Sequence, residues 1–431
     1  MSLRSKTRQQ DPSAEDRLSS LPSEVLNIIL GKIPFKSAVQ TCVLAKKWRK
    51  RWLALSKFDL NSKDLTVVPD NEVFRWAKVA SITNEFIRRH TGRITSFSLR
   101  TGFLPHYTDL YKWIYNLAMQ NIESLCLQEY EKHPSEIPIH MFSFEKLLVL
   151  KLINFRLRAP PSLRVFNTLL ELSLERVAIN DLELYRLIAS CPNLDKLSLL
   201  NISGLDRLRI HAPKLTKLVI DTRFQDIGTG AGSILSSVII VGSHRAPGER
   251  VILNQRSVIH CLSRLRLLQT LHLPGDFIEL LAADSILEYW PLLNNTVTTV
   301  ALGHVRFETV SVFKLCISLL TNCPNIKLFG FSIQSSKGPE LIANFLKENR
   351  GRFLFRELKA ITIICPRRCE MGCSLTFVEF LSRHSPNLKI INIMKEGSIN
   401  AFIVSQIILQ LKTTCPWAEV QYFEDEIIEC L

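Results

Sequence analysis

The sequence predicts an α/β protein in which a short N-terminal helical block precedes a long, curved solenoid of stacked strand–helix repeats. Two observations predict this fold. Residues 21–52 carry apolar side chains at helical spacing, and an apolar-x-x-apolar-x-apolar pattern recurs from residue 94 to the end of the chain. A single repeat of this size cannot bury its own strand, so neighbouring repeats must stack.

Composition sets the broad class. The chain has 431 residues, of which 46% are hydrophobic, enough to bury a large core in two or three domains. An uninterrupted apolar run of about 18 residues is missing, so no membrane span is expected. Residues 1–16 are polar and charged, and they lack the apolar core of a secretory signal. We therefore expect a disordered basic tail on an intracellular protein of the nucleus, the cytoplasm or both.

The cysteines indicate the redox environment of the protein, and the net charge indicates which classes of partner it could bind. Eleven cysteines, an odd number, are scattered through apolar segments, which indicates buried free thiols in a reducing compartment. The net charge of +14 allows binding to nucleic acid or anionic membranes. A solvated basic surface, or attraction to an acidic protein, explains the same charge without either partner.

The N-terminal block has the signals of three short helices. Ser20 can cap a first helix that contains Pro22 in its first turn and ends at Gly31. A second helix is expected over 36–43 and a third over 45–55. The third would place Trp48 and Trp52 on one face.

This block contains more apolar side chains than three short helices can hide from one another. An exposed apolar patch on so small a module usually marks a partner site. The basic run at 46–51 has a rival interpretation as a nuclear-import or nucleic-acid signal. Because Trp48 is expected to be buried within that run, a solvated helix face is the preferred interpretation.

The string LPSEVLNIILGKIPFKSAVQTCVLAKKWRKRW resembles an F-box, from Leu21-Pro22 through Ile33-Pro34 to Lys47-Trp48-Arg49. The resemblance implies that residues 17–56 form a three-helix F-box that docks on a Skp-type adaptor, which in turn joins it to a cullin-based ubiquitin ligase. The residues implied to bind the adaptor are Leu21, Pro22, Ile29, Leu30, Ile33, Pro34, Val43, Leu44 and Trp48.

The rest of the chain is an irregular repeat with a mean period of about 27 residues, which is within the leucine-rich-repeat range. Each copy predicts a strand whose fourth and sixth positions share one face. The thirteen copies begin at Ile94, Ile122, Leu147, Leu169, Leu194, Leu215, Leu235, Leu268, Val297, Ile326, Leu358, Leu388 and Trp417. An additional copy at Leu205 suggests a further strand closely connected to its neighbours.

Helices are expected between the strands, over 181–190, 310–320 and 341–346. Each helix would end at a recurring proline, because proline cannot continue a helix and sends the chain into the next strand. These prolines are Pro192, Pro324, Pro386 and Pro416. One unit is therefore helix, proline turn and strand. Stacked units predict parallel strands on the inner wall and helices outside.

An F-box followed by irregular leucine-rich repeats with Cys-Pro-Asn-Leu turns resembles the plant F-box/LRR proteins. Residues 355–363, 377–381 and 385–389 are in addition similar to the FBD region of that group. The implied organisation is a solenoid over 57–350, continued by FBD-like repeats over 351–423.

Three other segments invite a chemical interpretation. Cys365, Cys369 and Cys373 with His384 could hold zinc, but their spacing is wider than the usual knuckle, so free thiols are preferred. The glycines of 228–232 lack the offset of a phosphate-binding turn, and a flexible insert between repeats is preferred. Residues 242–250 are polar and turn-rich, and a loop on the solenoid rim is a common place for recognition.

These observations predict a non-catalytic substrate-recognition subunit of an SCF-type ubiquitin ligase, with no cofactor and no catalytic or metal residues. The expected partners are the Skp-type adaptor, through it a cullin, and an unknown target protein. The basic surface of this chain would suit an acidic target. Membranes and nucleic acid are not expected partners. A repeat scaffold, nucleic-acid-associated or not, that recruits no ligase is the alternative, and an enzyme built on the cysteine loop is a third hypothesis. The sequence leaves the target open, and also whether a small molecule fills the concave face.

Overall fold

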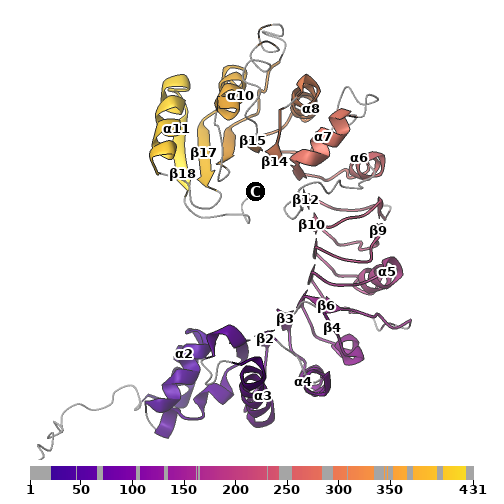
Figure 1. Cartoon of the computed structure of the whole chain (residues 1–431), viewed down its shortest axis with the longest axis vertical. Helices are drawn as coiled ribbons and strands as arrows, with labels where there is room; N and C mark the ends of the chain where they lie inside the picture. The colour runs from indigo at the N-terminus through magenta and orange to yellow at the C-terminus, as the bar shows by residue number, and fades with distance from the viewer. Residues whose placement is uncertain are drawn as a thin grey trace, which may run out of the picture. The chain divides into compact units, whose positions relative to one another are not determined.

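The computed structural model describes residues 21–44, 46–65, 71–102, 107–130, 134–161, 163, 166–230, 232–241, 255–283, 295–307, 309–333, 344, 347, 353–365, 372–395 and 401–423 (Figure 1). The chain forms two compact units, Met1–Leu150 and Lys151–Leu431. The expected tail at 1–16, the cap Ser20 and the rim loop at 242–250 lie outside the described residues.

The first unit begins with two α-helices, α1 (Ser23–Gly31) and α2 (Phe35–Gln40). The expected second helix over 36–43 is shorter than predicted, because α2 ends at Gln40 and the 3₁₀ turn η1 (Thr41–Val43) follows it. The expected third helix over 45–55 is wrong in its form: the chain there makes the short 3₁₀ turns η2 (Lys46–Trp48) and η3 (Arg51–Ala54). A regular helix would set the cations of 46–51 one turn apart, for example Lys46 and Lys50, and such like-charge pairs destabilise it.

The apolar core of this helical block is completed by the segments that follow it. Leu26 and Leu30 of α1 are fully buried. The ring of Phe35 lies 4.8 Å from that of Phe58 in strand β1 (Lys57–Asn61) and 6.1 Å from that of Phe86 in helix α3 (Glu72–Arg89). Part of the block's apolar surface is therefore buried within this chain, against β1 and α3.

The rest of the first unit already has the repeat design. Strands β1, β2 (Ser96–Thr101) and β3 (Ser124–Glu129) pair in parallel and in register. Strand β1 carries no copy of the repeat pattern and was not predicted. The connections contain η4 (Ser62–Asp64), α3 and α4 (Tyr107–Met119), and after β3 come β4 (Ser135–Glu136) and η5 (Ile139–Ser143).

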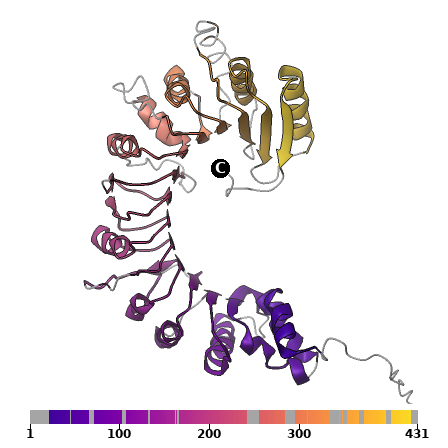
Figure 2. The same cartoon turned by 180° about the vertical axis from the view of Figure 1, so that it is seen from behind.

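The second unit is a curved solenoid whose strands line the inner side and whose helices lie outside (Figure 1, Figure 2). Its sheet has the order β5-β7-β8-β10-β12-β13-β14-β15-β16-β17-β18. These strands are β5 (Val149–Ile153), β7 (Glu171–Glu175), β8 (Lys196–Leu200), β10 (Lys217–Asp221), β12 (Ser237–Ile240), β13 (Thr270–Pro274), β14 (Thr299–Val305), β15 (Leu328–Ile333), β16 (Ala360–Cys365), β17 (Ile390–Lys395) and β18 (Glu419–Phe423). Neighbouring strands from β7 to β18 pair in parallel.

Each of the thirteen predicted copies of the repeat contains one of these strands or β2 or β3, so the fold class is confirmed. The short strand β6 (Phe155–Arg156) follows β5. The outer helices are α5 (Asp181–Ala189), α6 (Gln255–Ser263), α7 (Gly275–Ala283), α8 (Val310–Thr321), α10 (Gly372–Arg383) and α11 (Ala401–Thr414). The helix expected over 341–346 falls almost wholly outside the described residues.

The proline turns tie each repeat to the one before it. Asn193, which follows Pro192, donates a side-chain hydrogen bond to the carbonyl of Asn167, one repeat back. Asn325 and Asn387 make the same contact with the carbonyls of Asn295 and Arg356, at 2.7 and 2.8 Å. The Asn of the Pro-Asn motif thus satisfies a backbone acceptor that the turn would otherwise leave unpaired.

Two expectations around residue 205 and residue 228 need correction. The copy at Leu205 does form a strand, β9 (Arg207–Ile210), but it pairs with β11 (Asp226–Thr229) in a separate two-stranded sheet. Gly228 and Thr229 therefore end a strand and do not begin a flexible insert. The pairing is stabilised by an ion pair between Arg209 and Asp226, at 2.5 Å.

None of the helices in the described part of the chain is long and apolar enough to cross a membrane.

Candidate functional site

The N-terminal module exposes large aliphatic side chains. Val25, Ile28 and Ile29 are spaced i, i+3, i+4 and share one face of α1, opposite the buried Leu26 and Leu30. Ile33 follows in the turn to α2, and Val43 and Leu44 close η1. Their exposed fractions run from 36% to 83%. We name this set the F-box apolar surface: Val25, Ile28, Ile29, Ile33, Val43 and Leu44.

The structure divides the nine residues implied to bind an adaptor. Ile29, Ile33, Val43 and Leu44 are exposed and belong to the F-box apolar surface. Pro22 and Pro34 are also exposed, and Leu21 is half-buried. Leu30 and Trp48 are buried, at 0% and 5% exposed, so they support the module's core and offer a partner no surface.

Val25 and Ile28 are exposed members of this surface that the nine implied residues do not include. Val25 and Ile28 are three residues apart and lie on the same helical face as Ile29. This spacing is the sequence signal that could have found them. Ile28, at 61% exposed, offers more surface than Ile29 or Ile33.

The basic run beside this surface is mostly solvated. Lys46, Arg49 and Lys50 are exposed, whereas Trp48 between them is buried. Arg51 is different, because its guanidinium donates to the side-chain oxygen of Ser23 at 3.2 Å and so links η3 to the start of α1. This arrangement agrees with the solvated-face interpretation of residues 46–51.

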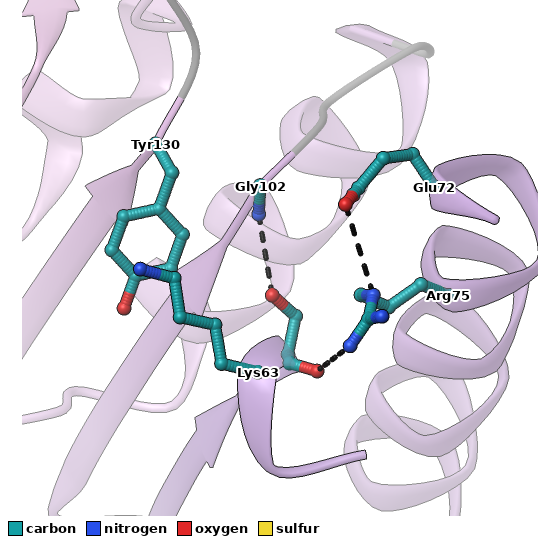
Figure 3. A pocket seen from close by; sticks show the side chains of 6 residues that line it. Lys63, Glu72, Arg75, Gly102 and Tyr130 are labelled. Carbon is teal, nitrogen blue, oxygen red and sulfur yellow. Dashed lines mark hydrogen bonds and ion pairs between the residues drawn. The ribbon is translucent and has the colours of Figure 1, made fainter. Parts of the chain in front are cut away.

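A pocket of about 410 Å³ lies in the first unit, where β1, β2 and β3 end and α3 begins (Figure 3). Its lining residues are Ser62, Lys63, Glu72, Arg75, Gly102 and Tyr130. The ammonium of Lys63 lies 3.9 Å from the centre of the Tyr130 ring, a cation–π contact. Sequence reasoning missed this pocket.

The inner wall of the second unit changes character along the solenoid. On β5 to β10, the side chains that alternate with the core include charged ones: Lys151, Glu171, Glu175, Lys196, Lys217 and Asp221. On β12 to β17 the corresponding side chains are small, polar or aliphatic: Ser237, Ile239, Thr270, His272, Thr299, Ala301, Leu328, Gly330, Ala360, Thr362, Ile364, Ile390, Asn392 and Met394. The wall therefore offers a charged stretch and a neutral stretch.

The eight cysteines that the structure describes carry free thiols, and six are buried. Burial raises the pKa of the Cys191 thiol to about 11 and that of Cys323 to about 12, so these thiols stay protonated and unreactive. Cys369 and the side chain of Cys373 lie outside the described residues. The interpretation of residues 365–373 as a loop of free thiols therefore stays a prediction.

The fold and the exposed module define a class of protein: an F-box joined to a leucine-rich-repeat solenoid. Comparison with known families agrees. Residues 18–59 match the F-box domain, and residues 110–329 match the LRR repeats of the family named for the FBD-associated F-box protein At5g56370. The chain belongs to this family of FBD-associated F-box proteins with leucine-rich repeats.

Individual relatives are named as F-box/FBD/LRR-repeat proteins. The chain is 26% identical to the Arabidopsis thaliana F-box/FBD/LRR-repeat protein At1g13570 over 424 residues, which cover 95% of this chain and 99% of the relative. It is also 26% identical to F-box/FBD/LRR-repeat protein At2g04230 of the same plant, over 72% of this chain and 70% of that protein. A third, the putative F-box/FBD/LRR-repeat protein At5g44950, is 29% identical over 43% of this chain and 42% of its own length.

Proposed function

We propose that this chain is the substrate-recognition subunit of an SCF-type ubiquitin ligase. F-box domains generally bind Skp1-type adaptors. The observation that carries the proposal is the F-box apolar surface, six aliphatic side chains exposed on a module whose core is otherwise closed. A group of exposed large aliphatic side chains on so small a module is typical of a protein interaction site.

The energetics favour an apolar face of the adaptor against this surface. Each aliphatic side chain that is removed from water contributes about 1.5–3 kcal/mol when its burial is complete. Six partly exposed side chains therefore supply enough apolar burial to offset part of the entropy lost in association. The neighbouring cations Lys46, Arg49 and Lys50 remain free to meet an acidic rim on the adaptor.

The repeats would hold the target protein, with the inner wall of the second unit as the contact surface. In this role the chain performs no bond chemistry. It raises the effective concentration of target lysines near a conjugating enzyme held through the cullin, and the rate gain comes from proximity. Such a role requires the chain inside the cell, in the nucleus or the cytoplasm.

A retention assay with purified Skp-type adaptor tests the proposal. The paired variant Ile28→Ser/Leu44→Ser removes two exposed side chains and should lower adaptor affinity by at least about tenfold, because each lost apolar contact is worth about 1 kcal/mol or more. The matched control is Val73→Ser/Phe74→Ser, which changes two exposed apolar residues of α3 outside the F-box apolar surface.

The control variant should retain the adaptor as the unchanged chain does. If the unchanged chain does not retain the adaptor, the ligase role fails and a repeat scaffold remains. If both variants lose retention equally, the F-box apolar surface is not the docking site.

A further inference from the structure

The pocket of the first unit lies where ligands commonly bind in parallel sheets. Lys63 follows β1, Gly102 follows β2 and Tyr130 follows β3, so three carboxyl ends of parallel strands meet at it. Glu72 and Arg75 come from the first turn of α3. In open parallel sheets, ligands bind outside the carboxyl ends of the strands, beside helix N-termini.

Lys63 supplies a cation that is held in position without a carboxylate. Its ammonium rests over the Tyr130 ring, and the Tyr130 hydroxyl donates to the side-chain oxygen of Asn61 at 3.3 Å. The backbone nitrogen of Tyr130 donates to the carbonyl of Thr101 at 2.9 Å. Within the part of the chain that the structure describes, none of the ion pairs includes Lys63.

Arg75 supplies a second, fixed cation. Its Nη1 donates to the carbonyl of Ser62 at 3.2 Å, and its Nε lies 3.8 Å from the Glu72 carboxylate (Figure 3). The same Nη1 also donates to the carbonyl of Leu65, at 3.3 Å. The backbone nitrogen of Gly102 donates to Ser62 Oγ at 3.2 Å. A Cβ on Gly102 would come within 2.9 Å of a Glu72 oxygen, so a larger residue here would require the Glu72 side chain to shift.

The charges that line the pocket determine which anion fits. Lys63 and Arg75 contribute two positive charges and Glu72 one negative charge, which leaves a net charge of one positive unit. One carboxylate group bound here would bring the charge of the site to zero, whereas one doubly charged phosphate group would leave it with a net negative charge. The volume of about 410 Å³ accepts a carboxylate together with the short chain that bears it.

We propose that this pocket binds a carboxylate group, with Lys63 as its main ion-pair partner and the Tyr130 ring as the support of that lysine. An Asp or Glu side chain of the target protein is one source of the carboxylate, and that source rests on the proposed function. A free small carboxylate is the other source, and the chemistry of recognition is the same.

Lysine footprinting on the full chain tests this proposal. The chain is acylated with a small amine-reactive ester, and the labelling rate of Lys63 is measured by mass spectrometry relative to Lys112, an exposed lysine of α4 that does not line the pocket. The probes are a capped peptide with two glutamates, its glutamine counterpart, and glutarate. At about 10 mM, the glutamate peptide or glutarate should slow labelling of Lys63 about threefold, as expected for a weak ion pair.

Variants of the lining residues distinguish a pocket that binds a carboxylate from a single exposed lysine that attracts anions. Glu72→Gln removes the competing carboxylate and should increase protection, whereas Tyr130→Leu removes the ring and should abolish it. Tyr130→Phe retains the ring and should retain the protection. An exposed lysine that merely attracts anions would keep its protection in Tyr130→Leu, so that variant decides between the two cases.

Each outcome has a defined consequence. Protection by the peptide alone assigns a target side chain as the source, protection by glutarate alone assigns a small-molecule carboxylate, and protection by both supports either source. Equal labelling with and without both probes overturns the proposal. The adaptor takes no part in this assay. A negative result would therefore contradict the carboxylate site without contradicting the ligase role.

Discussion

At the scale of single residues, His272 shows how the inner wall of the second unit is kept neutral. Burial, and to a smaller degree the charge of the nearby His304, lowers the pKa of His272 to about 4. The imidazole is therefore uncharged at the pH of the cell. Together with Thr362 on β16 and Asn392 on β17, it gives the wall hydrogen-bonding groups without charge.

This shift predicts a pH dependence of stability. The unfolded chain binds a proton at His272 near pH 6.5, while the folded chain resists protonation down to about pH 4, so acid favours unfolding. Stability should be full above pH 6.5 and should fall as the pH drops to about 4, by about 3 kcal/mol at most. Urea unfolding of the full chain across this range measures the loss.

The variant His272→Gln should flatten this part of the pH profile. The matched control is His211→Gln, at an exposed histidine of the same unit. A profile for His272→Gln as steep as that of the unchanged chain would show that His272 stays solvated and contributes nothing to the acid sensitivity.

At the scale of elements, helix α1 has two faces with different roles. The buried face holds the helix in place, and the exposed face is available to a partner. Leu30→Ala removes a fully buried side chain and should reduce the local stability of the N-terminal module by about 2–5 kcal/mol. Ile28→Ala, two residues away on the exposed face, should reduce it by less than about 1 kcal/mol. Native-state hydrogen exchange of residues 21–60 measures both. Equal losses for the two variants would mean that the assigned faces of α1 are wrong.

The sequence predicts these elements unevenly, for physical reasons. The strands from β2 onward that carry a copy of the repeat were predictable, because each copy places two apolar residues on the core side of one strand. Strand β1 carries only Phe58 and Leu60 inward, a pattern too short to identify alone. The 3₁₀ turns η2 and η3 depend on repulsion among neighbouring cations and on packing of Trp52 against Phe86, which periodicity does not reveal.

The two candidate sites were predictable to different degrees. The F-box apolar surface was predictable because its residues are close in sequence and their number exceeds what short helices can hide. The pocket joins Lys63 to Tyr130, which are 67 positions apart and meet only because β1, β2 and β3 align their carboxyl ends. The signal that could have found it is the position of Lys63, Gly102 and Tyr130, each within two residues of the end of a strand.

At the scale of the whole molecule, each of the two units has its own core and its own surface to offer. The first unit encloses an aromatic core around Phe35, Phe58 and Phe86 and leaves the F-box apolar surface outside. The second unit buries its strands against helices and leaves a wall that is charged on β5 to β10 and neutral on β12 to β17. This division suits a protein that holds an adaptor with one unit and a target with the other.

Hydrogen exchange of the full chain, with and without purified Skp-type adaptor, tests the central claim most directly. The account predicts slower exchange in α1 and in the segment from α2 to Leu44 when the adaptor is present, with exchange in α11 and β18 unchanged. Exchange in α1 and η1 that is the same with and without a saturating concentration of adaptor would contradict the claim that the F-box apolar surface is an adaptor-binding site.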